Sequence, residues 1–297
     1  MDFAALLAAE RKRARKPRLE SRCPAPLAWR TDRPQLCRQR HRVVQAPDVV
    51  FHIPAFVSEE EEAALLRAID ASPPEQWTNL SGRRLQNLGG LPRAEGMVPE
   101  AMPPWLLSLT NALAAGVFDA NHCLLNEYEP GQGIEAHRDG PRFAPRAAIL
   151  SLGSVAGFDF VDDKGELAAS LMLPPRGLLI FEGSAYEKWL HRVPAVRQDV
   201  ATTNLIRLDA TAEVPAPSMP PPRTKRVSLT LRQVNVLLSP RAEVEQQPRW
   251  KERAELARWL DSGPEQRQCD TRDKCWPEQQ PSLLRAQREE EVHSPES

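Results

Sequence analysis

The feature that most constrains the fold is a succession of short alternating segments between residues 122 and 193. Segments that place apolar side chains on every second position are typical of β-strands. We predict strands near 122–128, 134–138, 147–153, 157–161, 167–173, 178–183 and 188–193, followed by a later strand at 225–237. Such a series, joined by short turns like Asp162 to Gly165, predicts a double-sheet barrel of the jelly-roll type.

Two helices should precede most of these strands. Val49 to Pro54 has the pattern of a first strand, and Ser58 with Glu61 then forms a capping box at a helix start. This helix should continue to about Ala71. A second helix should open at Pro103-Pro104 and pack on the back of the larger sheet. We therefore expect a mainly β (α+β) fold with flanking helices.

One stretch, Asn126 to Asp139 (NEYEPGQGIEAHRD), contains His137 and Asp139 as a His-x-Asp pair. A turn at 129–133 separates two predicted strands, so both side chains should project the same way at a strand end. His191 stands alone on the return strand of a later hairpin. Two imidazoles and one carboxylate are the ligands of a facial-triad Fe(II) site. Taken singly, the pair also fits a solvated surface, and His191 fits an ordinary core or surface position.

The last predicted strand alternates in an unusual way. Its aliphatic face would pack into the core. Its other face carries Arg226, Ser228, Thr230 and Arg232. An edge strand with a solvated face would show this pattern, and so would a polar cavity that binds a small dicarboxylate. Arginine suits carboxylates because its planar fork bonds them bidentately.

Together these motifs resemble a known family. The order Asn-x-Tyr-x-Pro-Gly-x-Gly-Ile-x-x-His-x-Asp, a later His, then Arg-x-Ser-x-Thr-x-Arg, resembles the AlkB-homologue Fe(II)/2-oxoglutarate dioxygenases. The segments 77–92, 96–100 and 103–106 are most similar to the animal branch numbered six. The resemblance covers roughly residues 45–238 and leaves out both ends.

The resemblance implies a role for each matching residue. His137, Asp139 and His191 would bind Fe(II) as the catalytic ligands, leaving three positions for 2-oxoglutarate and O₂. The residues that would bind 2-oxoglutarate are Asn126, Tyr128, Arg226, Ser228, Thr230 and Arg232. One departure is the long spacing between His191 and Arg226, which we attribute to a Pro-rich surface loop at 194–223.

Residues 77–92 form either a surface hairpin or a lid over the site. The segment bears Arg83, Arg84 and Gln86. These side chains could contact a phosphate or a base, and the nucleotide-contacting loops of the resembled family occupy the same region. We therefore expect them to contact substrate.

The composition of the chain limits its class of protein and its cellular compartment. The 297 residues carry a net charge of −1, and no run of apolar residues is long enough to span a membrane. Five scattered cysteines argue against a disulfide framework, and the spacing of Cys269 and Cys275 does not fit a zinc knuckle. We expect a monomer in a reducing compartment, in the nucleus and cytoplasm.

Three regions follow from these patterns. Residues 1–45 hold 12 Lys/Arg against four acidic residues and should form a disordered basic arm. The dioxygenase domain should occupy 46–238. Residues 239–297 should be a mostly disordered charged tail with one short helix at 249–260.

Three functions fit the sequence. The first is oxidative demethylation of DNA or RNA, in which a base enters from a single strand or is flipped out, with release of succinate, CO₂ and formaldehyde. The second is a dioxygenase that acts on protein. The third is a non-catalytic nucleic-acid-binding protein that keeps the fold, against which the intact His/Asp/His and Arg/Arg sets argue. The basic arm, Arg83 and Arg84 favour nucleic acid as the partner.

Overall fold

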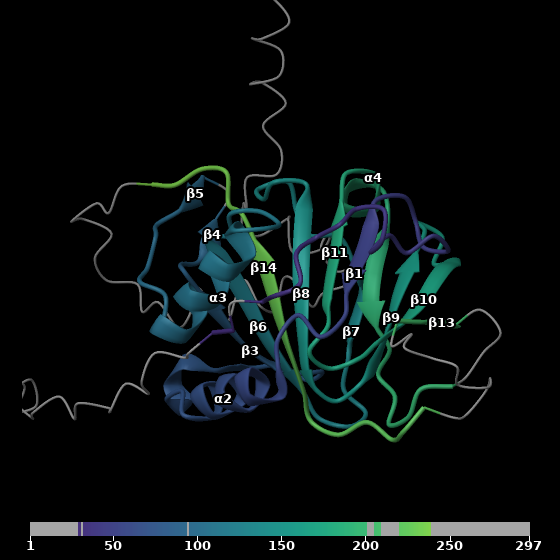
Figure 1. The fold of residues 1–297 in the computed structure, drawn as a ribbon, viewed down its shortest axis with the longest axis horizontal. Helices are drawn as coiled ribbons and strands as arrows, with labels where there is room; N and C mark the ends of the chain where they lie inside the picture. Colours follow the sequence, from purple (N-terminus) through teal and green to yellow (C-terminus); the bar gives the residue numbers. More distant parts are fainter. Residues whose placement is uncertain (1–28, 31, 94, 201–204, 209–219, 239–297) are drawn as a thin grey trace, which may run out of the picture.

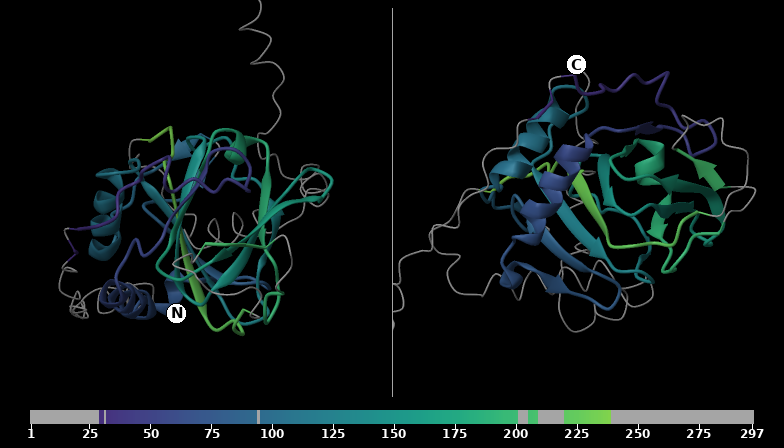
Figure 2. Two further views of the ribbon diagram at one scale, coloured as in Figure 1. Left: turned by 45° about the vertical axis from the view of Figure 1, so that its right-hand side comes forward. Right: turned by 60° about the horizontal axis from the view of Figure 1, so that its bottom comes forward.

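A computed structural model describes residues 29–30, 32–93, 95–200, 205–208 and 220–238. Two β-sheets face each other, and the two longer helices cover the outer side of the larger sheet (Figure 1). Figure 2 shows the helices and the smaller sheet on opposite sides of the larger sheet. This arrangement confirms the predicted mainly β fold with a jelly-roll core.

The described residues of the larger sheet form seven strands. In spatial order they are β1 (Val50–Ile53), β11 (Leu178–Glu182), β8 (Arg146–Gly153), β14 (Arg226–Arg232), β6 (His122–Tyr128), β3 (Arg84–Leu88) and β2 (Thr78–Asn79). The described smaller sheet comprises β13 (Leu205–Arg207), β10 (Leu167–Leu173), β9 (Ala156–Val161), β12 (Leu190–Val193) and β7 (Ile134–His137). A separate short hairpin pairs β4 (Pro92–Arg93) with β5 (Gly96–Met97). All these pairings are antiparallel except that of β10 with β13.

The main core lies between the larger sheet and the helices α2 (Glu59–Asp70) and α3 (Pro104–Ala114). The odd-numbered residues of β6 and β14 point to this side, so their aliphatic side chains pack on α2 and α3. The sheet face was therefore predicted correctly from alternation alone. A second core, rich in phenylalanine, fills part of the space between the two sheets.

The predicted helix starts are also confirmed. Ser58 Oγ accepts from the backbone of Glu61, and the Glu61 side chain accepts from the backbone of Ser58. This capping box satisfies N–H groups that the first helical turn cannot pair. In α3, Pro104 occupies the first turn, where a missing N–H has no cost.

Part of the expected basic arm is folded against the domain. Arg33 bonds Glu61 at 2.7 Å, and Val43 is buried against the second core. Arg42 pairs with Phe51 in an isolated β-bridge. The prediction of disorder is therefore wrong for residues 29–30 and 32–45. Apolar and ionic contacts compensate there for the entropy of ordering the chain.

The Pro-rich loop contains structure that composition did not reveal. Leu205–Arg207 adds β13 to the smaller sheet, and a buried ion pair joins Arg223 to Asp199. The short elements β4, β5 and α4 (Ser184–Glu187) were also missed, because two to four residues carry little periodic signal, whereas β2 and β3 form the hairpin that was one alternative for residues 77–92. The rest of both expected tails, including 249–260 and the cysteine pair, lies outside the described residues. No helix within those described ranges is long and apolar enough to cross a membrane.

Candidate metal centre and co-substrate pocket

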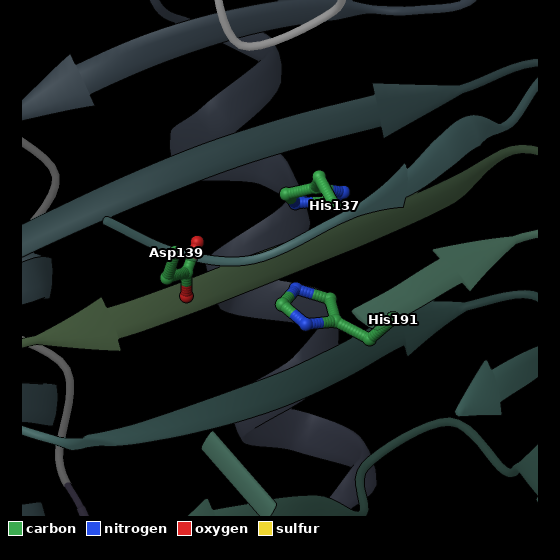
Figure 3. A group of neighbouring side chains, drawn as sticks. All are labelled: His137, Asp139 and His191. Carbon is green, nitrogen blue, oxygen red and sulfur yellow. The ribbon is translucent and has the colours of Figure 1, made fainter. Parts of the chain in front are cut away.

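His137, Asp139 and His191 meet between the two sheets. His137 ends β7, Asp139 follows two residues later, and His191 lies on β12 directly opposite His137. One ligand atom from each of the three lies within 4.8 Å of the others. Figure 3 shows the three side chains converging on one point. Residues 54 positions apart are thus brought together by the antiparallel pairing of β7 with β12.

Neighbouring groups fix the two imidazoles. Nδ1 of His137 lies 2.8 Å from the backbone oxygen of Glu135. A carbonyl oxygen only accepts, so Nδ1 carries the proton and Nε2 keeps a free lone pair. The ring of His191 stacks on Phe158, with centroids 5.5 Å apart and planes 16° from parallel. These contacts hold both rings ready to bind a metal ion.

The electrostatics keep the three groups in their metal-binding forms. Burial lowers the pKa of His137 to about 3, with a further contribution from His191, and burial also lowers the pKa of His191. Burial by itself would raise the pKa of Asp139, but Arg232 and the two histidines outweigh it, so that pKa is lowered. At neutral pH the set is therefore two neutral imidazoles and one carboxylate.

Arg232 is the partner of Asp139. Its Nη1 donates to Oδ1 of Asp139 at 2.6 Å, both side chains are buried, and the guanidinium lies 4.2 Å from the ring centre of Phe143. The second oxygen of Asp139, Oδ2, has no hydrogen-bond partner among the described residues. One oxygen is thus held by Arg232 while the other remains for a metal ion. The sequence predicted Arg232 as a ligand of 2-oxoglutarate and missed this ion pair.

Arg226 lies at the other end of the same strand face and is less completely paired. Its Nη2 donates to Ser151 Oγ at 3.0 Å, whereas Nε and Nη1 have no hydrogen-bond partner in the described ranges. The guanidinium carbon is 5.5 Å from the ring centre of Tyr128. Burial is the main reason that the pKa of Arg226 falls to about 10. A buried cation with unused donors is suited to a carboxylate from a ligand.

The remaining predicted pocket residues share this inner face. Asn126 lies opposite Ser228, and Tyr128 lies opposite Arg226, in the register of β6 with β14. All four are buried, as is Thr230. The donor set therefore fits both groups implied by the resemblance: Fe(II) at the triad and a small dicarboxylate near Arg226.

The three predicted substrate residues are separated by the sheet. Arg84 faces the helix side, bonds both oxygens of Glu127 at 2.6 and 2.9 Å, and stacks 4.1 Å from the ring centre of Trp77. Gln86 is buried on that same outer face, opposite Leu125. Alternation along β3 turns Arg84 and Gln86 away from the triad, which argues against the expected contact of these two side chains with a substrate at the metal centre. Arg83 alone faces inward.

Two inner-face residues were missed. Ser151 holds Arg226 and lies opposite Ser228, and its only sequence signal is a hydroxyl within the apolar run of β8. Tyr186, on α4, lies beside Asp139, with its hydroxyl 3.5 Å from the backbone oxygen of Asp139 and 3.3 Å from that of Gly140. Burial raises the pKa of Tyr186 above its usual range, so its hydroxyl stays protonated and can donate.

Comparisons with known proteins show which sequences and structures the chain resembles. The profile of the 2OG-Fe(II) oxygenase superfamily matches residues 91–232. The zebrafish (Danio rerio) protein named probable RNA/DNA demethylase ALKBH6 is 38% identical over 212 residues, which cover 66% of this chain and 90% of that protein. The Xenopus tropicalis tRNA (carboxymethyluridine(34)-5-O)-methyltransferase alkbh8 is 30% identical over 166 residues, covering 52% of this chain and 26% of that protein. The solved structure of OsALKBH1 aligns with a TM-score of 0.44 and 18% identity, over 62% of this chain and 97% of that one.

Proposed function

The chain belongs to the AlkB-homologue family of 2OG-Fe(II) oxygenases and is therefore a dioxygenase, and we propose that it removes alkyl groups oxidatively from nucleic acid. The observation that carries the proposal is the pairing of a complete His/Asp/His set with a buried, incompletely paired arginine. Buried charges lower stability. A non-catalytic protein would therefore gain nothing from the metal-binding set or from the incompletely paired arginine.

Each residue has a proposed task. His137, Asp139 and His191 hold Fe(II), which, when bound, couples oxidation of 2-oxoglutarate by O₂ to oxidation of a substrate C–H bond. Arg226 binds one carboxylate of 2-oxoglutarate, and the side chains that complete its pocket are Asn126, Tyr128, Ser228 and Thr230. Products would be succinate, CO₂ and, from an N-methyl group, formaldehyde.

The protein contributes orientation and a dry environment. Arg232 fixes the carboxylate of Asp139 through Oδ1 and leaves Oδ2 without a hydrogen-bond partner among the described residues. Phe158 and Phe181 pack against His191, at 5.5 and 5.1 Å between ring centres, and keep water from that side of the site. Such pre-organisation positions the cofactor and limits side reactions.

Two observations support nucleic acid as substrate. The zebrafish relative is named as a probable RNA/DNA demethylase and matches over 90% of its length. The first 45 residues carry 12 basic against four acidic residues, which favours attraction to phosphates. A methylated base would enter from a single strand or a flipped position.

The test is succinate release from 2-oxoglutarate by the full chain with Fe(II), with and without a panel of methylated DNA and RNA oligonucleotides. Stimulation by one oligonucleotide, with release of formaldehyde, supports the proposal. Turnover without stimulation would redirect the search to protein substrates. Binding of iron without any turnover would favour a non-catalytic role.

The salt dependence of binding provides a second criterion. An enzyme that contacts several phosphates should lose oligonucleotide affinity steeply between 50 and 200 mM salt, roughly 10³-fold for six contacts. A shallow slope would show that few phosphates are contacted and, where no oligonucleotide stimulates turnover, would argue against a nucleic-acid substrate.

A further inference from the structure

Arg83 is a buried cation on the inner face of the larger sheet. It is 1% exposed, and its Nε donates to Oδ1 of Asn126 at 2.9 Å. Asn126 is also buried and lies on β6, with its backbone opposite Leu85 of β3 on one side and Ser228 of β14 on the other. Arg83, the residue directly before β3, thus places a fixed positive charge against a residue of the co-substrate pocket.

Two close backbone contacts hold Arg83 in place. The N–H of Leu80 donates to the oxygen of Arg83 at 2.8 Å, closing the turn before β3. The N–H of Gly133 donates to the oxygen of Gly82 at 3.2 Å. A Cβ on Gly82 would come within 2.8 Å of the Gly133 oxygen, so a side chain there would push the two segments apart. Gly133 belongs to the turn that leads into β7 and His137. Arg83 is therefore anchored to the segment that carries the metal ligands.

The chemistry of the two side chains fixes the direction of the amide. A guanidinium has only donors, whereas an asparagine amide has an oxygen that accepts and a nitrogen that donates. Because Arg83 approaches Asn126, the amide oxygen must face Arg83. The NH₂ group must then point away from Arg83. Without Arg83 the amide could flip and present its oxygen to the pocket instead.

We propose that Arg83 is a positioning residue that locks the amide of Asn126 so that its NH₂ group donates into the co-substrate pocket. The inference rests on the proposed function, in which that pocket binds 2-oxoglutarate. An anionic co-substrate needs donors and is repelled by a carbonyl oxygen. Arg83 would therefore act on co-substrate affinity through Asn126.

The adjacent arginine offers a matched control. Arg84 is also held by an acceptor on β6, but its partner is Glu127 on the outer face. Neighbouring residues with the same side chain thus serve opposite faces of one sheet. The same substitution at both positions separates an effect on the pocket from a general loss of stability.

The experiment measures binding of Mn²⁺, and then of 2-oxoglutarate to the Mn²⁺-loaded full chain, by titration calorimetry. Mn²⁺ replaces Fe(II) so that no turnover occurs. For Arg83→Met we expect the Kd for 2-oxoglutarate to rise roughly 10- to 100-fold, as for a lost charge-assisted hydrogen bond. The Kd for Mn²⁺ should stay within about twofold. Arg83→Lys, which keeps a donor and the charge, should recover most of the affinity.

A variant of the partner residue tests the direction of the amide. Asn126→Asp keeps an acceptor for Arg83 but has no N–H to donate, so it should lose as much 2-oxoglutarate affinity as Arg83→Met. Arg84→Met should lower thermal stability and leave the Kd for 2-oxoglutarate unchanged.

The outcomes separate two kinds of failure. If wild-type protein binds Mn²⁺ but no 2-oxoglutarate, the proposed function is contradicted, and so is this inference, which depends on it. If wild-type protein binds 2-oxoglutarate while Arg83→Met binds it equally well, only the role of Arg83 is overturned. Equal losses of affinity in Arg83→Met and Arg84→Met would also overturn it, because they would indicate a general effect on folding.

Discussion

The inner face of β14 has a buried arginine at each end. The two arginines differ in the groups that bond their guanidinium. Arg232 bonds a protein carboxylate, Asp139, at 2.6 Å. Arg226 bonds the neutral hydroxyl of Ser151, and its Nε and Nη1 have no partner among the described residues. At one end of the strand the arginine is neutralised by a carboxylate of the protein. At the other end the arginine still has donors that can bind a ligand.

This difference shows how the fold separates two tasks. A buried ion pair is costly to break, because the remaining charge loses its partner in a low-dielectric interior. The Arg232–Asp139 pair therefore fixes the metal ligand permanently. A buried guanidinium without a carboxylate lowers stability until one arrives, and binding of a dicarboxylate would relieve that cost. Stability should be gained at the Arg226 end only when the co-substrate is bound.

The largest effect should follow from Asp139→Ala. This change removes a proposed iron ligand and the counterion of Arg232 at once. We expect loss of metal retention and of 2-oxoglutarate turnover, and a decrease of about 3–5 kcal/mol in the free energy of unfolding. Metal content by mass spectrometry and denaturant unfolding measure both. Retained turnover would exclude Asp139 from the site.

Arg232→Met should be nearly as destabilising in metal-free protein, by about 3 kcal/mol, because it leaves the buried carboxylate of Asp139 without a cation. Added Mn²⁺ should restore part of the lost stability by supplying positive charge to that carboxylate. Thermal unfolding with and without Mn²⁺ checks this. If the variant is as stable as wild type, the ion pair does not matter for folding and the contrast between the two ends disappears.

Arg226→Met should have the opposite signature. The ligand-free protein should be as stable as wild type or slightly more stable, because an apolar side chain replaces a buried, incompletely paired cation. Its affinity for 2-oxoglutarate should fall by about 2–4 kcal/mol, since the carboxylate loses its cation. In wild type, 2-oxoglutarate at about 100 times its Kd should add roughly 2.7 kcal/mol of stability, and the same concentration should add less than about 1 kcal/mol in the variant. If ligand-free Arg226→Met is clearly less stable than wild type, the charge of Arg226 is already balanced by groups of the protein.

The smallest effect of a single group concerns pH. In metal-free protein the pKa of His137 is about 3, well below its unfolded value of roughly 6.5. Between these values the unfolded chain binds a proton that the native protein does not, so stability is present above about pH 6.5 and decreases as the pH falls. From pH 7 to pH 5 we expect a loss of roughly 2 kcal/mol from His137 alone. His191 and His122, whose pKa values are also lowered by burial, should add to it. Unfolding of chelator-treated protein at several pH values measures this, and a flat profile would contradict the burial of these rings.

The longer elements of the fold could be predicted because their signals are local. The strands β6 and β10 were predicted with their observed bounds, since alternation with a period of two is encoded in consecutive residues. The start of α2 was predicted for the same reason, because Ser58 and Glu61 lie within one turn of each other. The four-residue strands β1, β7 and β12 were predicted as well, but the short elements β4, β13 and α4 depend on the neighbours they pack on and had no comparable signal.

The candidate site also has features that local sequence predicts and features that it does not. The sequence by itself determined which side chains share a face of each strand, and so grouped Asn126 with Tyr128 and Arg226 with Arg232. Only the tertiary structure decided that Arg84 faces away from the triad, that Arg232 pairs with Asp139, and that Arg83 holds Asn126. The physical reason is that a face is a property of backbone periodicity, whereas a partner depends on which strands lie side by side and in what register.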